Sequence, residues 1–392
     1  MITKTTASLP ESTLPFEFRG HIPALDGLRG VAVLMVLVVH FYLTEGEMLQ
    51  AYPFLGPLLS KMAFAGTWGV ELFFVLSGFL ITGILVDAKR NSNYFSVFYM
   101  RRVLRIFPLY YTVLTVIFVV LPIFAPFDQA AVDIAHRQIW LWTYLQNAPW
   151  SGGHWNDSDL FRLLHFWSLC VEEHFYLLWP LIVRFTGLRH LTLIGIGGIC
   201  LSLLARVWHT MPDSPVILGW TSLTKLDGLL IGSLIAIGCR NISVNKLLDG
   251  ILAWVMVFSG IGFAVIVGIP RKAALGYWSA FPELVTVIFF GCVVLYAMKQ
   301  GSALSHILRC RILASFGKFS YGIYVIHYVC APGFIQLFQL RSLLGWLGSP
   351  LLSQGVFYLL TIGSSYGLAV ISWHSMEKHF LSLKSHYEYR CS

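Results

Sequence analysis

The chain has 392 residues, of which 57% are hydrophobic and 12% are charged, and its mean hydropathy is +0.71. A soluble domain carries about twice this share of charged residues, so the composition favours a membrane protein without deciding against a large soluble core. The seven cysteines are odd in number and scattered, which argues against a disulfide framework and a zinc site.

Segment length decides for the membrane, because a helix needs about 20 mostly apolar residues to cross a bilayer. Unpaired backbone amides are costly in lipid, so helices are the expected spanning form. Unbroken apolar runs such as Val31–Val39 also lack the alternation of a barrel strand. The sequence predicts an all-α polytopic protein with about ten transmembrane helices, near 22–43, 68–88, 104–122, 166–184, 191–209, 217–238, 251–269, 280–298, 317–338 and 354–376.

The basic residues give the orientation through the positive-inside bias. With a cytoplasmic N-terminus, the inner segments hold 18 of the 27 lysines and arginines and the outer segments hold six. The other three, Arg29, Arg206 and Lys225, lie within predicted helices. Both termini are therefore expected in the cytoplasm. Loops rich in basic residues also explain the net charge of +8 without a nucleic-acid partner.

The chain reads as one membrane domain over 22–384, between a cytoplasmic segment at 1–21 and a short cytoplasmic tail at 385–392. The first segment lacks the features of a cleavable signal peptide, so we expect helix 22–43 to be retained. No soluble domain is expected after the last helix. The longest outer stretch, 123–165, contains Trp140, Trp142, Trp150 and Trp155, which suits either the headgroup interface or a loop over a substrate site.

Ten ionisable residues fall at predicted membrane depth, where each costs ~2.5–3.5 kcal/mol on insertion scales and tends to face the bundle interior. Salt bridges between helices would explain any one of them. The whole set indicates a polar interior: Arg29, His40, Glu71, Glu172, Glu173, Arg206, Lys225, Asp227, Glu283 and His327.

Arg29 and His40 give the sharpest geometry. They are 11 residues apart on the first helix, which places them within ~20° of one face and ~16 Å apart along the axis. A guanidinium suits phosphate recognition, and an imidazole is the usual general base near neutral pH. A phosphate-bearing donor held at Arg29 would need a long flexible arm, such as phosphopantetheine, to reach His40. A packing role for His40 is the alternative.

Two further groups carry chemistry. Arg101, Arg102 and Arg105 open the third predicted helix, either as a topological anchor or as a clamp for the phosphates of a nucleotide donor. In the fourth helix Glu172 shares a face with Ser168 and Tyr176. Glu172 and Glu173 point about 100° apart, so at most one is expected to aim straight at a shared site. A structural interhelical pair is the alternative there. No phosphate-binding Gly-rich loop, zinc motif or serine elbow occurs.

Seven short segments together resemble the membrane-bound acyltransferase-3 family, whose members O-acetylate surface polysaccharides, nodulation factors and some macrolides. The resemblance covers roughly residues 21 to 384. Two positions depart from the family pattern: Lys225 stands where arginine is usual, and His174 where glutamine is usual. The segments are Leu25–Val33 followed by His40, Gly69–Ile81, Tyr99–Tyr111, His165–Tyr176, Leu226–Gly232, Phe316–His327 and Glu377–Lys378.

The resemblance implies a catalytic pair of Arg29 and His40. It also implies that Glu172 or Glu173 and the three clustered arginines support donor binding or acceptor activation. Supporting roles fall to Ser168, Tyr176, Lys225, Asp227 and His327. Some relatives carry an appended esterase-like domain, so this chain is expected to act alone or with a separate partner.

These points predict a bacterial inner-membrane acyltransferase with acyl-CoA, on family grounds acetyl-CoA, as donor substrate. It would have no permanently bound cofactor and no metal. The expected partners are an envelope glycan or glycolipid acceptor and membrane lipid, and a homo-oligomer stays open. His40 would act as general base or as a covalent acyl carrier. A proton-coupled transporter or lipid-linked glycan exporter is the main alternative, and a membrane sensor or scaffold is a third.

Overall fold

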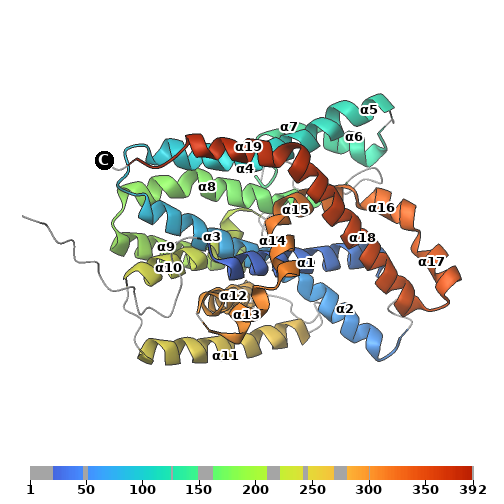
Figure 1. Cartoon of the computed structure of the whole chain (residues 1–392). Coiled ribbons are helices and arrows are strands. Elements are labelled where there is room, and N and C mark those ends of the chain that lie inside the picture. The colour runs from blue at the N-terminus through green and yellow to red at the C-terminus, as the bar shows by residue number, and fades with distance from the viewer. Residues whose placement is uncertain are drawn as a thin grey trace, which may run out of the picture.

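The computed structural model describes residues 21–46, 52–124, 127–148, 162–209, 221–241, 246–268, 280–299 and 301–390. Every regular element in these ranges is a helix (Figure 1), so the all-α prediction is confirmed for them. Trp150 and Trp155 of the expected outer loop lie outside the described residues.

Long helices form the body of the molecule, and short ones extend or connect them. The long helices are α1 (Pro23–Glu45), α3 (Gly69–Asp87), α4 (Tyr94–Thr115), α8 (Trp167–Phe185), α9 (Leu188–His209), α10 (Leu226–Asn241), α11 (Lys246–Gly268), α12 (Phe281–Met298) and α18 (Pro350–Ser372). The short helices are α2 (Leu55–Ala65), α5 (Leu121–Phe124), α6 (Gln129–His136), α7 (Gln138–Trp142), α13 (Ala303–Leu308), α14 (Arg311–Lys318), α15 (Ser320–Val329), α16 (Ala331–Phe338), α17 (Leu340–Leu347) and α19 (Lys378–Ser382).

Seven helical stretches among the described residues are long and apolar enough to cross a membrane, or eight if one bent pair counts as a span. The bent pair is α15 with α16 and α17, which turn by 67° just before Pro332 in the first turn of α16. Two predicted spans are not among these stretches. The span 166–184 corresponds to α8, which carries three charged residues, and the span 217–238 corresponds to α10, which has only 16 residues. The protein is therefore multi-pass, while the count of about ten and the side of the termini stay predictions.

Helix α1 lies in the middle of the bundle and contributes to four separate buried apolar clusters. Such burial around a helix is typical of a core element. Backbones approach closely at glycines of α1 and of its neighbour α14: a Cβ on Gly27 of α1 would lie 1.9 Å from the Leu308 carbonyl oxygen, and one on Gly317 of α14 would lie 1.8 Å from that of Asp26. Small residues permit such contacts between membrane helices, and they fix α1 against α13 and α14.

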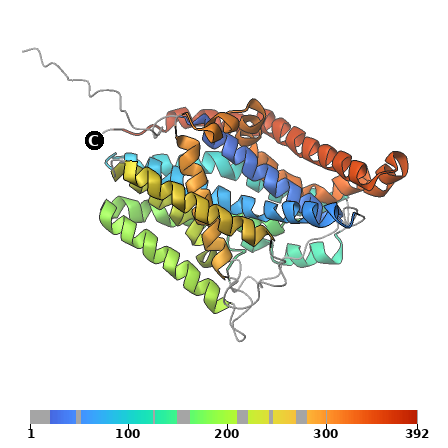
Figure 2. The ribbon, with the colours of Figure 1, turned by 90° about the horizontal axis from the view of Figure 1, so that it is seen from below.

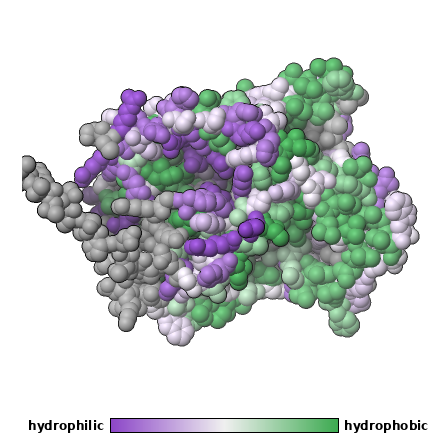
Figure 3. All heavy atoms as spheres, in the orientation of Figure 1, coloured by the Kyte–Doolittle hydropathy of each residue, from purple (hydrophilic) through white to green (hydrophobic). Residues whose placement is uncertain are grey.

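The surface agrees with a lipid environment. Figure 3 shows hydrophilic side chains gathered on the half of this face toward the C-terminus, and hydrophobic ones toward α2, α17 and α18. Figure 2 shows α9 along one edge of the bundle and α18 along the opposite edge. Large apolar side chains on these helices are exposed, among them Leu204 at 64% and Leu359 at 75%. Apolar area of this extent is expected to be covered, and lipid would cover it.

The pairing of α3 with α10 makes a stability prediction. A Cβ on Gly232 would lie 2.0 Å from the Val75 carbonyl oxygen, whereas Gly238 on the same helix has no atom within 4 Å of such a position. We expect Gly232→Ala to lower the midpoint of thermal unfolding in detergent, because overpacking costs typically 1–3 kcal/mol. Gly238→Ala should leave the midpoint unchanged or raise it, since alanine is the better helix former. Equal midpoints for the two variants would contradict this close approach.

Candidate active site

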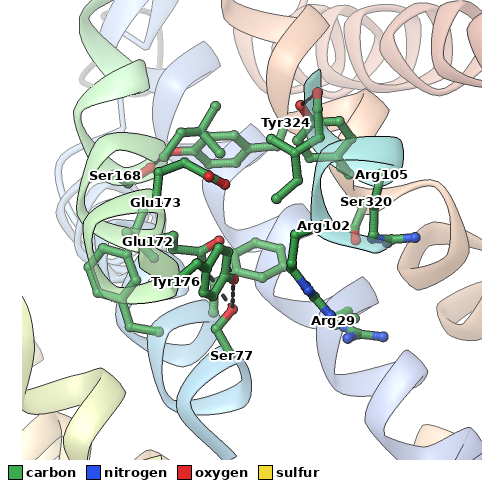
Figure 4. Close-up of a pocket in the computed structure, with 16 residues that line it drawn as sticks. Arg29, Ser77, Arg102, Arg105, Ser168, Glu172, Glu173, Tyr176, Ser320 and Tyr324 are labelled. Atoms are coloured by element: carbon green, nitrogen blue, oxygen red, sulfur yellow. Dashed lines mark hydrogen bonds between the residues drawn. The ribbon is translucent and has the colours of Figure 1, made fainter. Parts of the chain in front are cut away.

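A cavity lies between α1, α3, α4, α8 and α15, with an empty volume of about 730 Å³ including space open to solvent. Seven of the residues singled out from the sequence line it. Arginines come from α1 and α4, and carboxylates and hydroxyls come from α8 (Figure 4). The lining residues that the sequence singled out are Arg29, Arg102, Arg105, Ser168, Glu172, Glu173 and Tyr176.

Three guanidinium groups form one wall of this cavity, facing the glutamates of α8 in Figure 4. Arg29 Nη1 lies 3.2 Å from Asp26 Oδ1 one turn earlier on α1. The Arg102 guanidinium carbon lies 5.3 Å from the centre of the Tyr176 ring, within the range of a cation–π contact. The wall thus presents planar, permanently charged donors, which suit phosphate groups.

Both carboxylates of α8 border the cavity, and the expectation that at most one aims straight at a shared site stays a prediction. Neighbouring residues lie about 100° apart around a helix, so the cavity extends around this part of the α8 surface. Glu172 is held in place: Ser77 Oγ donates to its Oε1 at 2.8 Å, and the Tyr176 hydroxyl donates to its Oε2 at 2.9 Å. Ser77 was not expected in the site, although it lies within the segment Gly69–Ile81 that carried the family resemblance.

Arg101 is not among the residues that line the cavity. Its Nε donates to the Tyr387 carbonyl oxygen at 2.7 Å, and its guanidinium carbon lies 6.0 Å from the centre of the Tyr389 ring. Successive residues differ by about 100° around a helix, so Arg101 and Arg102 face different neighbours. Of the three clustered arginines, the structure gives Arg102 and Arg105 to the cavity and Arg101 to the C-terminal segment.

His40 lies outside the cavity lining and is half-buried beside two buried histidines, His165 and His327. Its Nδ1 is 2.9 Å from His327 Nε2, and its ring stacks on Tyr328 with 4.4 Å between centroids. His165 completes the cluster, with its ring centre 6.2 Å from that of His40 and 5.2 Å from that of His327. Sequence reasoning missed His165, which opens the segment His165–Tyr176 and whose side chain has no hydrogen-bond partner in the described structure.

The cavity and the histidine cluster share a wall. Ser168 and Tyr324 line the cavity, and their hydroxyl oxygens are 2.5 Å apart. The Tyr324 hydroxyl donates to the backbone carbonyl of His165 at 3.0 Å, and the Tyr324 carbonyl accepts from His327 at 2.8 Å. Tyr324 therefore connects the cavity lining to the His165 backbone and to the His327 ring.

Lys225 and Asp227 lie elsewhere, in a buried ion cluster at the ends of α3, α9, α10 and α12. Arg206 pairs with Asp227 at 2.7 Å and with Glu283 at 3.3 Å, and Lys225 pairs with Glu283 at 2.7 Å and with Glu71 at 3.2 Å. Lys225 is thus a point charge between two carboxylates, which does not require the planar fork of an arginine. Removing one member would leave a buried charge uncompensated, which is strongly destabilising, so a structural role fits these two residues.

His174, the other departure from the family pattern, links α8 to the segment before α10. Its Nδ1 lies 2.6 Å from Ser222 Oγ, and it does not line the cavity. No group of three or more histidine, cysteine or acidic side chains in the described ranges is arranged to hold a metal ion.

Comparison with known protein families identifies the family of this chain. A family model described as an acyltransferase domain matches residues 22–373, most of the chain. The chain belongs to the acyltransferase-3 family. Every cavity and histidine residue described above falls within the matched range. No solved structure matches the chain significantly.

Several curated proteins are similar to the chain. The putative peptidoglycan O-acetyltransferase YrhL of Bacillus subtilis is 27% identical over 91% of this chain and 54% of its own length. The O-acetyltransferase OatA of Staphylococcus aureus is 27% identical over 79% of this chain and 50% of its own length. The peptidoglycan O-acetyltransferase OatA of Listeria monocytogenes is 28% identical over 79% and 49%. The chain therefore spans about half the length of these relatives.

Proposed function

We propose that this chain is an integral membrane O-acyltransferase that moves an acetyl group from acetyl-CoA to a hydroxyl of a cell-envelope glycan or glycolipid. The observation that carries the proposal is the cavity with three arginines on one wall, whose lining residue Tyr324 hydrogen-bonds to the His327 ring, the partner of His40. Membership of the acyltransferase-3 family supports transfer over transport. Peptidoglycan is the acceptor class in the names of two of the relatives.

The arginine wall would hold the phosphates of the donor. Arg29, Arg102 and Arg105 offer bidentate, permanently charged groups. From Arg29 to His40 is ~16 Å along α1, a distance that the phosphopantetheine arm of CoA could span. The thioester would then lie beyond Ser168 and Tyr324, near the histidine cluster.

His40 would act on the acceptor hydroxyl. As that oxygen attacks the thioester carbonyl, His40 takes its proton. Collapse of the tetrahedral intermediate breaks the bond from carbon to sulfur, and the proton passes to the sulfur, so that the products are the O-acetyl ester and CoA. A covalent acyl-histidine would pass through the same atoms in two steps.

The location and partners follow from the same proposal. A multi-pass protein acting on envelope glycans would reside in the bacterial inner, or plasma, membrane. Acetyl-CoA would arrive from the cytoplasm as a substrate, with no permanently bound cofactor. Lipid would cover the exposed apolar faces, and a homo-oligomer stays compatible with the fold.

The test uses the full chain purified in detergent with radiolabelled acetyl-CoA and either peptidoglycan fragments or membrane glycolipid extract. We expect release of CoA and transfer of label that depend on the acceptor. Binding of acetyl-CoA is measured separately by equilibrium dialysis. A chain that is folded but neither binds acetyl-CoA nor releases CoA with either acceptor would overturn the proposal.

A further inference from the structure

The hydrogen bonds of His327 fix which of its ring nitrogens carries a proton. His327 Nδ1 lies 3.0 Å from the Ile323 carbonyl oxygen and 2.8 Å from that of Tyr324, both one turn earlier on α15. A carbonyl oxygen can only accept, so Nδ1 is the donor. In a neutral imidazole the other nitrogen is then an acceptor, and His327 Nε2 presents a lone pair.

That lone pair determines the state of His40. His327 Nε2 is 2.9 Å from His40 Nδ1, and because Nε2 accepts, His40 Nδ1 must donate. A neutral His40 therefore carries its proton on Nδ1 and leaves Nε2 bare. The two backbone carbonyls of α15 can only accept, so they set the direction of both the hydrogen bond to His327 and the hydrogen bond between His40 and His327.

Packing keeps this arrangement rigid. The His327 side chain is fully buried, and the His40 ring stacks on Tyr328 at an interplanar angle of 28°. The Arg162 guanidinium carbon lies 5.3 Å from the centre of the same Tyr328 ring. In the described part of the chain, the polar contacts of His327 are the two carbonyls and His40, so no carboxylate competes for its Nε2.

We propose that His327 is a positioning residue that holds His40 in the tautomer whose Nε2 is free to react. The inference rests on the proposed function and names the reacting atom: His40 Nε2 takes the proton of the acceptor hydroxyl, or attacks the thioester if an acyl-histidine forms. While Nε2 holds the proton, Nδ1–H stays bonded to His327, which disperses the charge. The proton then leaves from Nε2 to the sulfur of CoA, and His40 returns to the neutral form protonated on Nδ1.

Three variants separate this role from simple packing. In His327→Gln the amide oxygen can stand where Nε2 stood and accept from His40. In His327→Asn the amide reaches only as far as Nδ1, and in His327→Leu there is no polar group. We expect kcat to fall about 10- to 100-fold in the asparagine and leucine variants, by analogy with loss of a group that orients a metal-binding histidine, and to fall less in the glutamine variant.

Donor binding provides the control, because the arginine wall is not touched by these substitutions. The affinity for acetyl-CoA should be unchanged in all three variants. Folded asparagine and leucine variants with native kcat would overturn the inference. So would a glutamine variant that is folded but as impaired as the leucine variant, because an acceptor at this position would then be insufficient.

A measurement that does not depend on turnover keeps this inference separate from the proposed function. Nitrogen-15 NMR of histidine-labelled protein, with the His40 signals assigned by their loss in His40→Gln, reports which nitrogen is protonated. We expect a protonated Nδ1 and an unprotonated Nε2, and a loss of this preference in His327→Leu. The opposite tautomer would overturn the inference even if the enzyme transfers acetyl groups.

Discussion

Replacement of His40 by alanine is expected to abolish acetyl transfer while leaving donor binding intact. A positioned general base contributes typically 10²–10⁴-fold, so kcat should fall by at least about 100-fold. The affinity for acetyl-CoA should change little, since His40 is not part of the cavity lining. A change confined to kcat is the signature of an interaction made in the transition state. The measurement is CoA release under saturating donor, with binding determined separately.

The control for His40 is a histidine elsewhere on the bundle. His374 is exposed, and its Nδ1 contacts the Val370 carbonyl oxygen within its own helical segment. His374→Ala should retain native kcat. His40→Gln, which keeps much of the side-chain volume, guards against collapse of the packing with His327 and Tyr328. If His40→Ala and His40→Gln both fold and turn over like the native protein, the base is another residue.

Much of the helical architecture could be predicted, because lipid allows few backbone solutions. Long apolar runs gave helices at each predicted span that falls on described residues. The short helices α2, α13, α14 and α17 were missed, since they are set by tertiary packing rather than by hydrophobic length. The span 317–338 was predicted as one helix, but it is broken into α15 and α16 just before Pro332. The tight crossings at Gly27 and Gly232 were also invisible, because a glycine in a sequence does not name the backbone it meets.

The site was predictable within one helix and not between helices. The spacing of Arg29 and His40 placed both on one stripe of α1, and the structure shows that stripe facing α15: Arg29 borders the cavity with Ser320, and His40 contacts His327. The pairing of His40 with His327 joins residues 287 positions apart, which no helical periodicity could reveal. The family resemblance instead directed attention to Glu172 or Glu173 for donor binding or acceptor activation, and Glu172 bonds to Ser77 and Tyr176.

Substitutions in the arginine wall are expected to have the second large effect, a loss of affinity for acetyl-CoA. The neighbouring residue Arg101 provides the control. Arg102→Gln and Arg105→Gln should each weaken acetyl-CoA binding about 10- to 100-fold, because a hydrogen bond to a charged group contributes about 1.5–3 kcal/mol. Arg29→Gln should act in the same direction, since Arg29 shares the cavity. Equilibrium dialysis with labelled acetyl-CoA measures the affinity.

Arg101→Gln is the matched control, because Arg101 is the direct neighbour of Arg102 but bonds to the Tyr387 carbonyl. Its affinity for acetyl-CoA should stay near the native value. The effects on kcat at saturating donor should be small in all four variants, because phosphates held at this wall lie away from the reacting carbonyl. Affinities that fall equally for Arg101→Gln and Arg102→Gln would indicate a general electrostatic effect of the basic loops. They would contradict a donor site in this cavity, whereas a difference between these neighbours would place the phosphates against the wall that Arg102 and Arg105 form.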